Sequence, residues 1–470
     1  MARIIFLQRI WHEYLGPEII SANLKKHGHH VDLFIGRDTR SFLDKIQPKD
    51  IIAFSTMTGE HHWALEVAKG IKNKKDVMSI FGGPHPTFFP DIIKHPAVDI
   101  ICRGEGEFSM LDLANACDKG NDYINIPNLS VKRGSDIKRN DVRPLIGDLN
   151  EIPFPDRELY YAKYRIIKES YLKPFMASRG CPFLCSFCFN EKLRTIYANK
   201  GQYVRFYSPL NLINQIKEVL SKYRFKSIYF MDDLFALNQK WLEEFAALYK
   251  KEIKMPFVCS SHVNALNEDI IRILKDAGCR VVSFGIETGN ERLRNQLLNK
   301  HITNGQIEEI ARLFKKYKLK FITFNMIGFP GETVSDALET IELNIRMGTP
   351  YPRCSFVTPY PGTEIAKRYK DKLIMKDIGS IDQQTRLSFE VKEPEKLYNL
   401  HYFFQTAILF PYLLRPIKKL VGFRPNILFK LWWIVVYFFI ITRSETRNFF
   451  HTLIIAHRTF SFSLKEKDRG

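Results

Sequence analysis

The sequence predicts an α/β protein built from two parallel-sheet units and a mainly helical C-terminal region. Residues 1–125 and 173–375 each alternate short apolar runs with helical stretches, a pattern typical of parallel sheets covered by helices. The last 95 residues are instead rich in aromatic residues and poor in glycine. With 470 residues, 45% of them hydrophobic and 26% charged, the chain can bury large cores. Intrinsic disorder, a collagen-like repeat and a small disulfide-stapled fold are therefore excluded as overall descriptions.

Five apolar runs are the expected strands of the first unit. They end in polar residues or glycine and cover residues 4–7, 31–35, 50–55, 77–83 and 98–102. Helical stretches such as 63–75 and 108–119 separate them, which predicts a doubly wound, Rossmann-like domain. Such sheets bind ligands at the carboxyl ends of their strands. The residues expected at those ends are Ser55, Thr56, Gly82, Gly83 and the turn 103–107.

Residues 126–172 have a different composition, dominated by Asn, Asp, Lys, Arg and Pro, and the run 152–156 is typical of an extended linker. Alternation resumes in the second unit, residues 173–375. Its expected strands are 175–178, 227–230, 257–260, 281–285, 321–327 and 353–357, and its expected helices are 209–223, 239–250, 268–277, 305–316 and 333–346. Six such units predict a partial or complete parallel (β/α) barrel with its chemistry on the loops after the strands.

The C-terminal region, residues 376–470, combines apolar and basic character. Between 411 and 470 there are 11 Lys and Arg against 3 Asp and Glu, which is 8 of the 19 net positive charges. The uncharged run 431–442 has 12 residues, fewer than the roughly 20 that span a bilayer. Trp432, Trp433 and the flanking basic residues predict a helix at a membrane surface, and nucleic acid is not expected as a partner. A buried helix in a helical cap and a transmembrane span are the open alternatives.

Cysteine usage indicates a reducing compartment. Eight cysteines are too few for a disulfide framework, and five of them are scattered and are expected to be small core residues. The N-terminus runs directly into a strand-like pattern and lacks the apolar core and cleavage site of a signal peptide. We therefore expect a cytoplasmic protein, held peripherally at the inner face of the membrane by its C-terminal region.

The strongest chemical signal is a cluster of three cysteines, Cys181, Cys185 and Cys188, directly after the first expected strand of the second unit. Three thiolates this close together can wrap a single soft metal centre. A structural zinc site normally has four ligands, and no second cysteine pair lies nearby in the sequence. An iron–sulfur cubane held by three cysteines would keep one iron open for another ligand. A structural zinc or iron–sulfur site is the alternative.

The spacing Cys-x3-Cys-x2-Cys, with Phe187 before the last cysteine, resembles the signature of the radical S-adenosylmethionine (radical SAM) superfamily. The resemblance implies a [4Fe–4S] cluster on Cys181, Cys185 and Cys188 whose open iron binds the amino and carboxylate groups of S-adenosylmethionine. One electron, from reduced flavodoxin or ferredoxin, then cleaves S-adenosylmethionine to methionine and a 5′-deoxyadenosyl radical. This radical takes a hydrogen atom from the substrate.

Later strand ends resemble the same family. Asp232 and Asp233 lie where the family places polar groups near the methionine ammonium, although Asp233 also fits a helix N-cap. Glu287 resembles the residue that contacts the ribose hydroxyls. The turn that contains Gly328 and Glu332 resembles the one that packs near the adenine, although Glu332 also fits a capping turn.

The first unit resembles the cobalamin-binding domain that precedes many radical SAM domains, and residues 358–364 resemble a loop of the cobalamin-dependent branch. A glycine pair without side chains would let a wide, flat corrin approach the backbone. The implied cobalamin contacts are Ser55, Thr56, Gly82, Gly83, His85 and Glu105. The motif D-x-H-x-x-G is absent from the first 130 residues, so no histidine of that motif is available as an axial ligand. A doubly wound domain without a ligand is the alternative.

The resemblance covers residues 1–375, in a branch that includes the anaerobic magnesium-protoporphyrin ester cyclase, hopanoid methylases and phosphinate methylases. One departure is His262, which stands where many relatives have Arg, so its role is open. The resemblance implies a cobalamin-dependent methyltransferase that acts on an unactivated carbon of a small molecule. A radical oxidative cyclase or rearrangement enzyme, and a non-catalytic membrane-bound carrier of cobalamin or an iron–sulfur cluster, are the alternatives. The basic, aromatic C-terminal region suggests a lipid-like or isoprenoid substrate.

Overall fold

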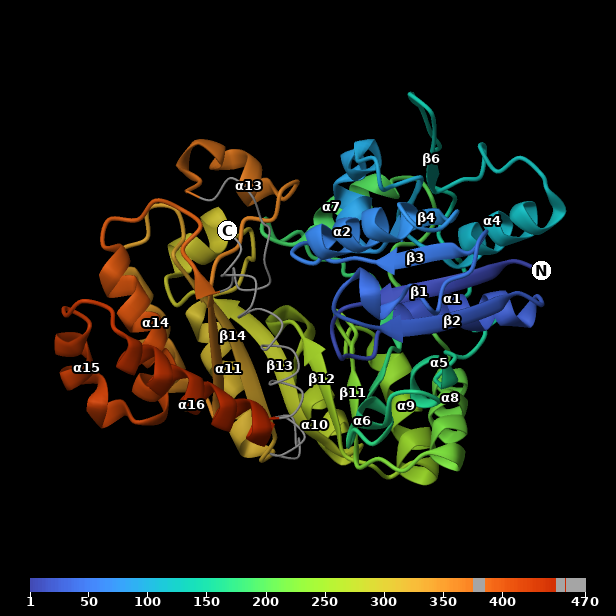
Figure 1. Cartoon of the computed structure of the whole chain (residues 1–470). Helices are drawn as coiled ribbons and strands as arrows, with labels where there is room; N and C mark the ends of the chain where they lie inside the picture. The colour runs from blue at the N-terminus through green and yellow to red at the C-terminus, as the bar shows by residue number, and fades with distance from the viewer. Residues whose placement is uncertain (375–384, 445–452, 454–470) are drawn as a thin grey trace.

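The computed structural model describes residues 1–374, 385–444 and 453. It contains an N-terminal α/β domain, a parallel-stranded second domain and a group of C-terminal helices, as the sequence predicts (Figure 1). In Figure 1 the first domain is blue, the second runs from green to orange, and the helices after residue 394 are orange-red to red on the side away from the first domain.

The first sheet is parallel over five strands, in the order β2-β1-β3-β4-β5. These are β1 (Arg3–Gln8), β2 (His30–Ile35), β3 (Ile51–Ser55), β4 (Met78–Gly82) and β5 (Ile100–Cys102). Ile4 and Phe6 share a core with residues of α1 (Leu15–Lys26) and α4 (Glu107–Lys119), whereas Ile5 and Leu7 share a core with residues of α2 (His61–Lys72). Successive strand residues therefore face opposite helical layers, which confirms the doubly wound domain.

The expected linker, residues 126–172, is partly structured. A hairpin of β6 (Leu129–Arg133) and β7 (Asp136–Arg139) adds two antiparallel strands to the first sheet beside β5. Its polar residues suggested a linker because only alternate positions of β6, such as Leu129 and Val131, bring apolar side chains to the core. Two short helices, α5 (Glu158–Tyr161) and α6 (Arg165–Lys168), then lead to the second domain.

The second domain is a six-stranded, fully parallel sheet that forms a partial barrel, in the order β15-β14-β13-β12-β11-β8. The strands are β8 (Leu172–Phe175), β11 (Ser227–Phe230), β12 (Phe257–Ser261), β13 (Cys279–Glu287), β14 (Lys320–Ile327) and β15 (Tyr351–Phe356). The intervening helices are α8 (Pro209–Lys222), α9 (Gln239–Glu252), α10 (Glu268–Asp276), α11 (Asn304–Lys316) and α12 (Val334–Met347). Phe230, Phe257 and Phe284 belong to the large core between this sheet and its helices.

The chain leaves the barrel sheet earlier than the expected strand 175–178. After β8 it forms β9 (Ser178–Arg179), which pairs antiparallel with β10 (Arg205–Phe206). The cause is Asp232, whose carboxylate accepts hydrogen bonds from the backbone N–H of Ala177 at 3.1 Å and the hydroxyl of Ser178 at 2.5 Å. The cysteine cluster follows this ribbon, and α7 (Phe189–Ile196) starts directly after Cys188.

The described C-terminal helices are α13 (Glu364–Arg368), α14 (Pro394–Leu409), α15 (Leu414–Leu420) and α16 (Ile427–Ser444). Helix α14 packs on β15 and α12, with Leu400 and Phe404 fully buried. Helix α16 is long and apolar enough to cross a membrane by length and composition, and 17% of it is buried. Its buried Val436 and Ile440 join a core with Val258 of the barrel sheet. Because most of the helix is exposed, α16 is not the fully buried helix of a helical cap that the sequence analysis left open. The basic residues beyond Arg443 that the sequence singles out lie outside the described residues.

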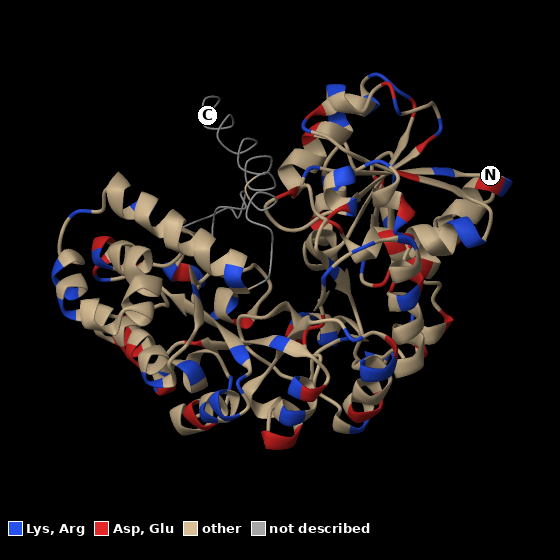
Figure 2. Cartoon of the chain, turned by 90° about the horizontal axis from the view of Figure 1, so that it is seen from below, with Lys and Arg blue, Asp and Glu red and all other residues tan. Residues whose placement is uncertain are grey.

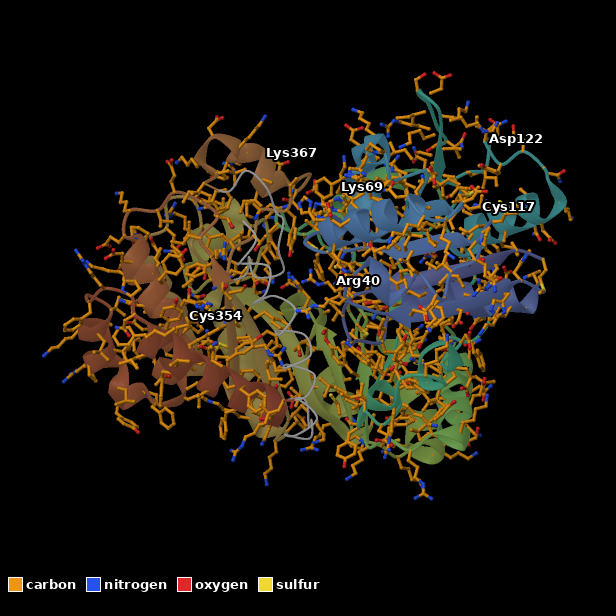
Figure 3. All side chains as sticks on the ribbon, in the orientation of Figure 1. Arg40, Lys69, Cys117, Asp122, Cys354 and Lys367 are labelled. Carbon is orange, nitrogen blue, oxygen red and sulfur yellow. The ribbon has the colours of Figure 1, made fainter. Side chains whose placement is uncertain are left out.

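The eight cysteines are all free thiols. Cys117 on α4 and Cys354 on β15 lie in different domains, far from each other (Figure 3). Cys102, Cys259 and Cys354 are buried, which confirms that the scattered cysteines are mostly small core residues. Acidic and basic residues are spread over the helices of both domains (Figure 2).

Candidate active site

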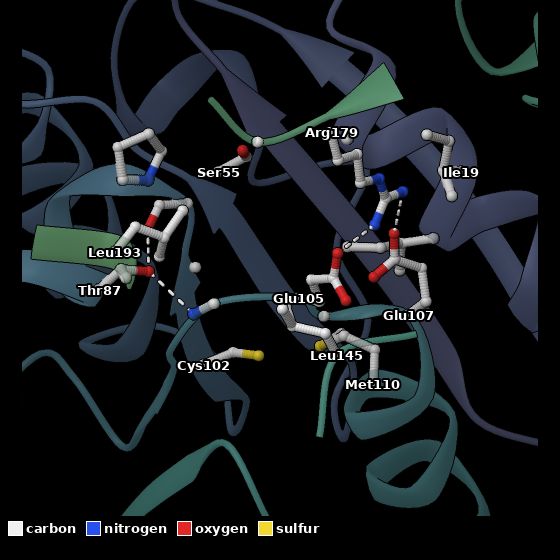
Figure 4. A pocket seen from close by; sticks show the side chains of 18 of the residues that line it. Ile19, Ser55, Thr87, Cys102, Glu105, Glu107, Met110, Leu145, Arg179 and Leu193 are labelled. Carbon is white, nitrogen blue, oxygen red and sulfur yellow. Dashed lines mark hydrogen bonds and ion pairs between the residues drawn. The ribbon is translucent and has the colours of Figure 1, made fainter. Parts of the chain in front are cut away.

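A cavity of about 430 Å³ lies between the first domain and the second (Figure 4). One wall is formed by the carboxyl ends of β3, β4 and β5, as the sequence predicts for a ligand crevice. The opposite wall is formed by the β9–β10 ribbon, α7 and the end of β11. Much of the lining is apolar, for example Ile19, Met110 and Leu145. A broad, mainly apolar ligand with a few polar groups would fit such a space.

At the glycine pair, the first wall of the cavity consists of backbone and carries no side chain. Gly83 has a φ of +89°, and a Cβ there would lie 3.0 Å from the backbone nitrogen and oxygen of Thr56. Only glycine combines this conformation with so close an approach of the β4 end to the β3 end. Ser55, Gly82 and Gly83 all line the cavity. A side chain at Gly83 would therefore clash with the end of β3, and the contact of the glycine pair with a corrin stays a prediction.

Two residues predicted to contact cobalamin are turned away from the cavity. Thr56 is buried, and its hydroxyl donates to the carbonyl of Gly82 at 3.2 Å. His85 is also buried: it stacks on His61 at 3.9 Å, and its Nδ1 lies 3.1 Å from the hydroxyl of Thr58. Burial, together with the neighbouring histidines, lowers the pKa of His85 to about 3. His85 is thus a neutral, buried core residue. A histidine in a proline-flanked turn can have such a structural role without binding a ligand.

Glu105 lines the cavity but is engaged in ion pairs. Its carboxylate pairs with Arg179 at 2.9 Å and Arg205 at 2.8 Å, and accepts the backbone N–H of Ile146 at 3.0 Å. Arg179 also pairs with Glu107 at 2.6 Å (Figure 4). Although burial alone would raise it, the two guanidinium groups hold the pKa of Glu105 below its usual range. The main role of Glu105 is therefore to bind the first domain to the ribbon that leads into the cysteine loop.

The cysteine loop begins at a second position that requires glycine. Gly180 has a φ of +89°, and a Cβ there would lie 2.5 Å from the carbonyl oxygen of Tyr203. Cys185 is buried, and Cys181 and Cys188 are half-buried. Burial raises the pKa of Cys181 to about 12 and that of Cys185 to about 11. The pKa of Cys181 is also raised by Cys185 and Cys188, and that of Cys185 by Cys188. The three thiols therefore face a common, poorly solvated space.

This donor set fits a cluster better than a single metal ion. Within residues 1–374, 385–444 and 453, no three His, Cys, Asp or Glu side chains are grouped tightly enough to hold one ion. A cubane separates its thiolates, because each one ligates a different iron. Lys300 opposes the pKa elevation of Cys185, so a cation already lies near the place where thiolates and cluster would carry negative charge. Cys181, Cys185 and Cys188 are thus suited to hold three irons of a [4Fe–4S] cluster.

The two adjacent aspartates have different environments. Asp232 is 4% exposed, and its carboxylate accepts hydrogen bonds from Ala177 and Ser178, just before the cysteine loop. Burial raises its pKa to about 7. It therefore supports the loop and does not line the cavity. Asp233 lines the cavity and acts electrostatically on Cys181 and Cys188. Of the pair, Asp233 is the residue that lines the cavity, and a contact of either aspartate with S-adenosylmethionine stays a prediction.

Glu287 ends β13 in a left-handed conformation, with a φ of +67°. Its buried carboxylate pairs with the ammonium group of Lys300 at 2.6 Å, and both side chains are less than a tenth exposed. The sequence analysis does not identify this partner, since Lys300 lies in a polar turn without a recognised motif. Lys300 fixes the direction of the Glu287 carboxylate at the barrel edge beside the cysteine loop.

The turn after β14 is held by Glu332 itself. One carboxylate oxygen accepts the backbone N–H groups of Gly328 and Phe329, the latter at 3.1 Å. The other oxygen, Oε1, is buried and lacks a hydrogen-bond partner within the described chain. Burial raises the pKa of Glu332 to about 8. The capping role is therefore present, and Oε1 is the atom left for a ligand contact.

Comparisons with known proteins agree with this architecture. The model of the radical SAM superfamily matches residues 176–343, and the model of the B12 binding domain matches residues 10–114. An uncharacterized methyltransferase of Pyrococcus horikoshii is 32% identical over 359 residues, which are 73% of this chain and 76% of that protein. The anaerobic magnesium-protoporphyrin IX monomethyl ester cyclase of Rubrivivax gelatinosus is 26% identical over 377 residues, covering 75% of this chain and 66% of the cyclase.

Solved structures show the same fold at low identity. The radical S-adenosylmethionine methyltransferase TsrM from Kitasatospora setae, with cobalamin and a [4Fe–4S] cluster bound, has a TM-score of 0.68 at 14% identity and covers 95% of this chain and 100% of its own. The cobalamin-dependent radical enzyme OxsB, with aqua-cobalamin and S-adenosylmethionine bound, has a TM-score of 0.68 at 17% identity over 95% of this chain and 71% of its own. The chain therefore belongs to the radical SAM superfamily, in the branch with a B12-binding domain ahead of the radical domain, and it is an enzyme that uses a [4Fe–4S] cluster, S-adenosylmethionine and cobalamin.

Proposed function

We propose that this enzyme transfers a methyl group to an unactivated carbon of a small molecule. The observation that carries the proposal is the single cavity shared by the glycine-lined end of β4 and the ribbon before the cysteine loop. When bound, the cluster and S-adenosylmethionine supply a hydrogen-abstracting radical, and cobalamin supplies the methyl group. An unactivated carbon needs both, because it is not a nucleophile.

The chain's own residues provide a fixed and largely dry space for this chemistry. Arg179, held by Glu105 and Glu107, fixes the ribbon two residues before Cys181. Apolar residues such as Ile19 and Met110 limit water in the cavity. Water exclusion protects reactive species from side reactions.

Methyl transfer is tested with protein reconstituted anaerobically with iron, sulfide and cobalamin, and given S-adenosylmethionine that carries a deuterated methyl group. We expect S-adenosylhomocysteine and 5′-deoxyadenosine to form together, because one molecule of S-adenosylmethionine gives the methyl group and a second gives the radical. Formation of 5′-deoxyadenosine without S-adenosylhomocysteine would contradict methyl transfer.

A second candidate function is oxidative cyclisation or rearrangement with the same cofactors. It is favoured by the similarity to the magnesium-protoporphyrin ester cyclase, which extends over three quarters of this chain. The same assay separates the two functions, since cyclisation consumes no methyl group. The formation of 5′-deoxyadenosine in either case would exclude a non-catalytic carrier.

We infer that the enzyme acts on a lipid-like substrate as a cytoplasmic protein at a membrane surface. Leu428, Leu431, Val435 and Phe439 are each about half exposed or more and follow the three-to-four-residue spacing of one helical stripe on α16. Lys430 and other exposed basic residues of the C-terminal helices lie near this stripe in the chain. An apolar stripe beside basic residues suits the surface of an anionic bilayer. Because Val436 packs against the barrel, α16 would hold the barrel at that surface instead of crossing the bilayer.

Membrane binding is tested by sedimentation with vesicles of phosphatidylglycerol and phosphatidylethanolamine. The variant Leu431→Glu/Val435→Glu should lose binding, because it places two charges on the stripe. Leu210→Glu is the matched control, since Leu210 is an exposed leucine of α8, in the barrel domain. Equal binding of all three proteins would exclude α16 as the membrane contact.

We infer that the electron donor, reduced flavodoxin or ferredoxin, docks beside Leu184. This residue is 45% exposed and directly precedes the buried Cys185, so it marks a short path from the surface to the cluster position. Leu184→Glu should slow reduction of the cluster by flavodoxin and leave its reduction by dithionite unchanged. Equal rates of reduction by flavodoxin for the wild type and Leu184→Glu would exclude Leu184 from the docking surface.

A further inference from the structure

Asn190, directly after the cysteine loop, has no role in the function proposed above. It is the second residue of α7, and its side-chain nitrogen donates a hydrogen bond to Sγ of Cys188 at 3.7 Å. This distance is ordinary for a sulfur acceptor, because sulfur is a larger atom than oxygen. Cys188 therefore receives a hydrogen bond at the atom that would bind an iron of the cluster.

A partner on the other side of the amide fixes its orientation. Oδ1 of Asn190 accepts a hydrogen bond from the hydroxyl of Tyr203 at 2.7 Å. An iron-bound thiolate has no proton to donate, so it can only accept a hydrogen bond, and the amide nitrogen must face it. The reverse orientation would place two acceptors, Oδ1 and the sulfur, against each other. Tyr203 thus keeps an N–H group of Asn190 directed at Cys188.

The same amide also reaches the carboxylate of Asp233. Burial raises the pKa of Asp233, and a hydrogen bond from the Asn190 side chain opposes this effect. Burial also raises the pKa of Cys188, and hydrogen bonds from the backbone and the side chain of Asn190 oppose it. An amide nitrogen carries two N–H groups, so it can serve the sulfur and the carboxylate together. Asn190, Asp233 and Tyr203 all line the cavity, so this network joins the cavity wall to the cysteine loop.

The neighbouring residue holds this end of α7 in place. Phe189, the first residue of α7, stacks on Phe88 of α3 (Pro84–Phe88) with ring centroids 4.2 Å apart and planes inclined by 12°. The backbone N–H of Cys188 also donates to the carbonyl of Cys185 at 3.0 Å. Asn190 therefore starts from a fixed backbone, and its donor is directed by the fold and by Tyr203.

We propose that Asn190 raises the reduction potential of the [4Fe–4S] cluster through its hydrogen bond to Cys188. Hydrogen bonds to the cluster sulfurs are one of the factors that set such potentials. Reduction adds one electron from the flavodoxin or ferredoxin donor and breaks no bond, so the reduced cluster carries one more negative charge. A hydrogen bond is stronger to the more negative acceptor, so it favours the reduced cluster. The proposal rests on the cluster and is independent of methyl transfer.

The proposal is tested by redox titration of the cluster-loaded protein without substrate, followed by electron paramagnetic resonance of the reduced cluster. Asn190→Leu keeps the size of the side chain and removes its N–H groups, Asn190→Gln keeps an amide donor, and Tyr203→Phe removes the hydroxyl that holds Oδ1. The matched control is Thr195→Val, which removes an exposed hydrogen bond of the same helix, from the Thr195 hydroxyl to the carbonyl of Glu191 at 3.1 Å. Iron content and circular dichroism are measured for every variant.

A second pair of proteins separates the hydrogen bond from the charge of Asp233, whose carboxylate also loses a donor in Asn190→Leu. Asp233→Asn and Asp233→Asn/Asn190→Leu repeat the comparison without that charge. If the hydrogen bond to Cys188 sets the potential, Asn190→Leu should lower the potential in both backgrounds. A shift that disappears in the Asp233→Asn background would overturn the proposal.

We expect Asn190→Leu to lower the reduction potential by about 59 mV, which is a tenfold change in the ratio of reduced to oxidised cluster for a one-electron couple. Tyr203→Phe should cause a smaller shift in the same direction, Asn190→Gln should recover part of the loss, and Thr195→Val should keep the wild-type potential. An unchanged potential in Asn190→Leu, or an equal shift in Thr195→Val, would overturn the proposal. If Asn190→Leu loses iron, Tyr203→Phe decides, because an unchanged potential in that variant contradicts the proposal equally.

Discussion

Replacing Arg179 by methionine should destabilise the protein strongly, because the carboxylate of Glu107 would lose its charged partner. The Arg179 side chain is 15% exposed and that of Glu107 is 7% exposed, so solvent screens this pair little. Glu105 would keep Arg205, but the second carboxylate oxygen of Glu107 already lacks a partner within the described chain. Removal of one partner from a buried ion pair costs about 3–5 kcal/mol in the free energy of unfolding.

The assay is urea denaturation of the cluster-free protein, followed by circular dichroism and tryptophan fluorescence, in a double-mutant cycle. Glu107→Gln in the Arg179→Met background removes the unpaired charge, so the double variant should be more stable than the two separate losses predict, with a coupling of about 2 kcal/mol. The control is Arg312→Met, which breaks the exposed pair with Glu309 and should cost no more than about 0.5 kcal/mol. Additive losses in the cycle, within about 0.5 kcal/mol, would refute this reasoning.

Three further predictions concern the ligands and the turn after β14. Cys185→Ala should abolish cluster binding, measured as iron per chain, and 5′-deoxyadenosine release, whereas Cys117→Ala should change neither. Glu287→Gln should weaken S-adenosylmethionine binding several-fold with the iron content unchanged; unchanged affinity would assign Glu287 a purely structural role. Because burial raises the pKa of Glu332 from 4.5 to about 8, the folded state holds a proton that the unfolded state has released. The wild type should therefore lose stability relative to Glu332→Gln as the pH rises from about 4.5 to 8, by on the order of 1 kcal/mol per pH unit, and a pH-independent difference would contradict this.

Most of the fold can be predicted from the sequence because its periodicity is local. Each parallel strand is a short apolar run, and each covering helix repeats its apolar residues every three to four positions. The β6–β7 hairpin is missed because an edge hairpin buries few residues and exposes many charges. The early end of β8 is missed because it depends on Asp232, more than fifty residues away in the chain.

The candidate site is predictable where its chemistry lies within one short segment. Cys181, Cys185 and Cys188 lie within eight residues, so their spacing indicates a soft metal centre, and its resemblance to the radical SAM signature implies a [4Fe–4S] cluster. The partners that fix the site are far apart in the sequence: Arg179 pairs with Glu105 across 74 residues. No local pattern assigns such a pair. His85 and Thr56 show that a local pattern can also predict too much. Both follow predicted strand ends and were expected to contact a ligand, but both side chains are buried in the core.

The long-range ion pairs also determine how the two cofactor sites are related. Glu105 and Glu107 hold the ribbon before the cysteine loop, and Arg157 is a second buried link: it pairs with Glu13 of the first domain at 2.5 Å and donates to the carbonyl of Pro174 on β8 at 2.6 Å. Separation of the domains would break these buried ion pairs and the hydrogen bond to Pro174 together. Both walls of the cavity are therefore joined by buried contacts of the protein's own side chains. A radical and a methyl donor that must act on one carbon need such a fixed separation, because a misplacement of about 1 Å can cost two orders of magnitude in rate.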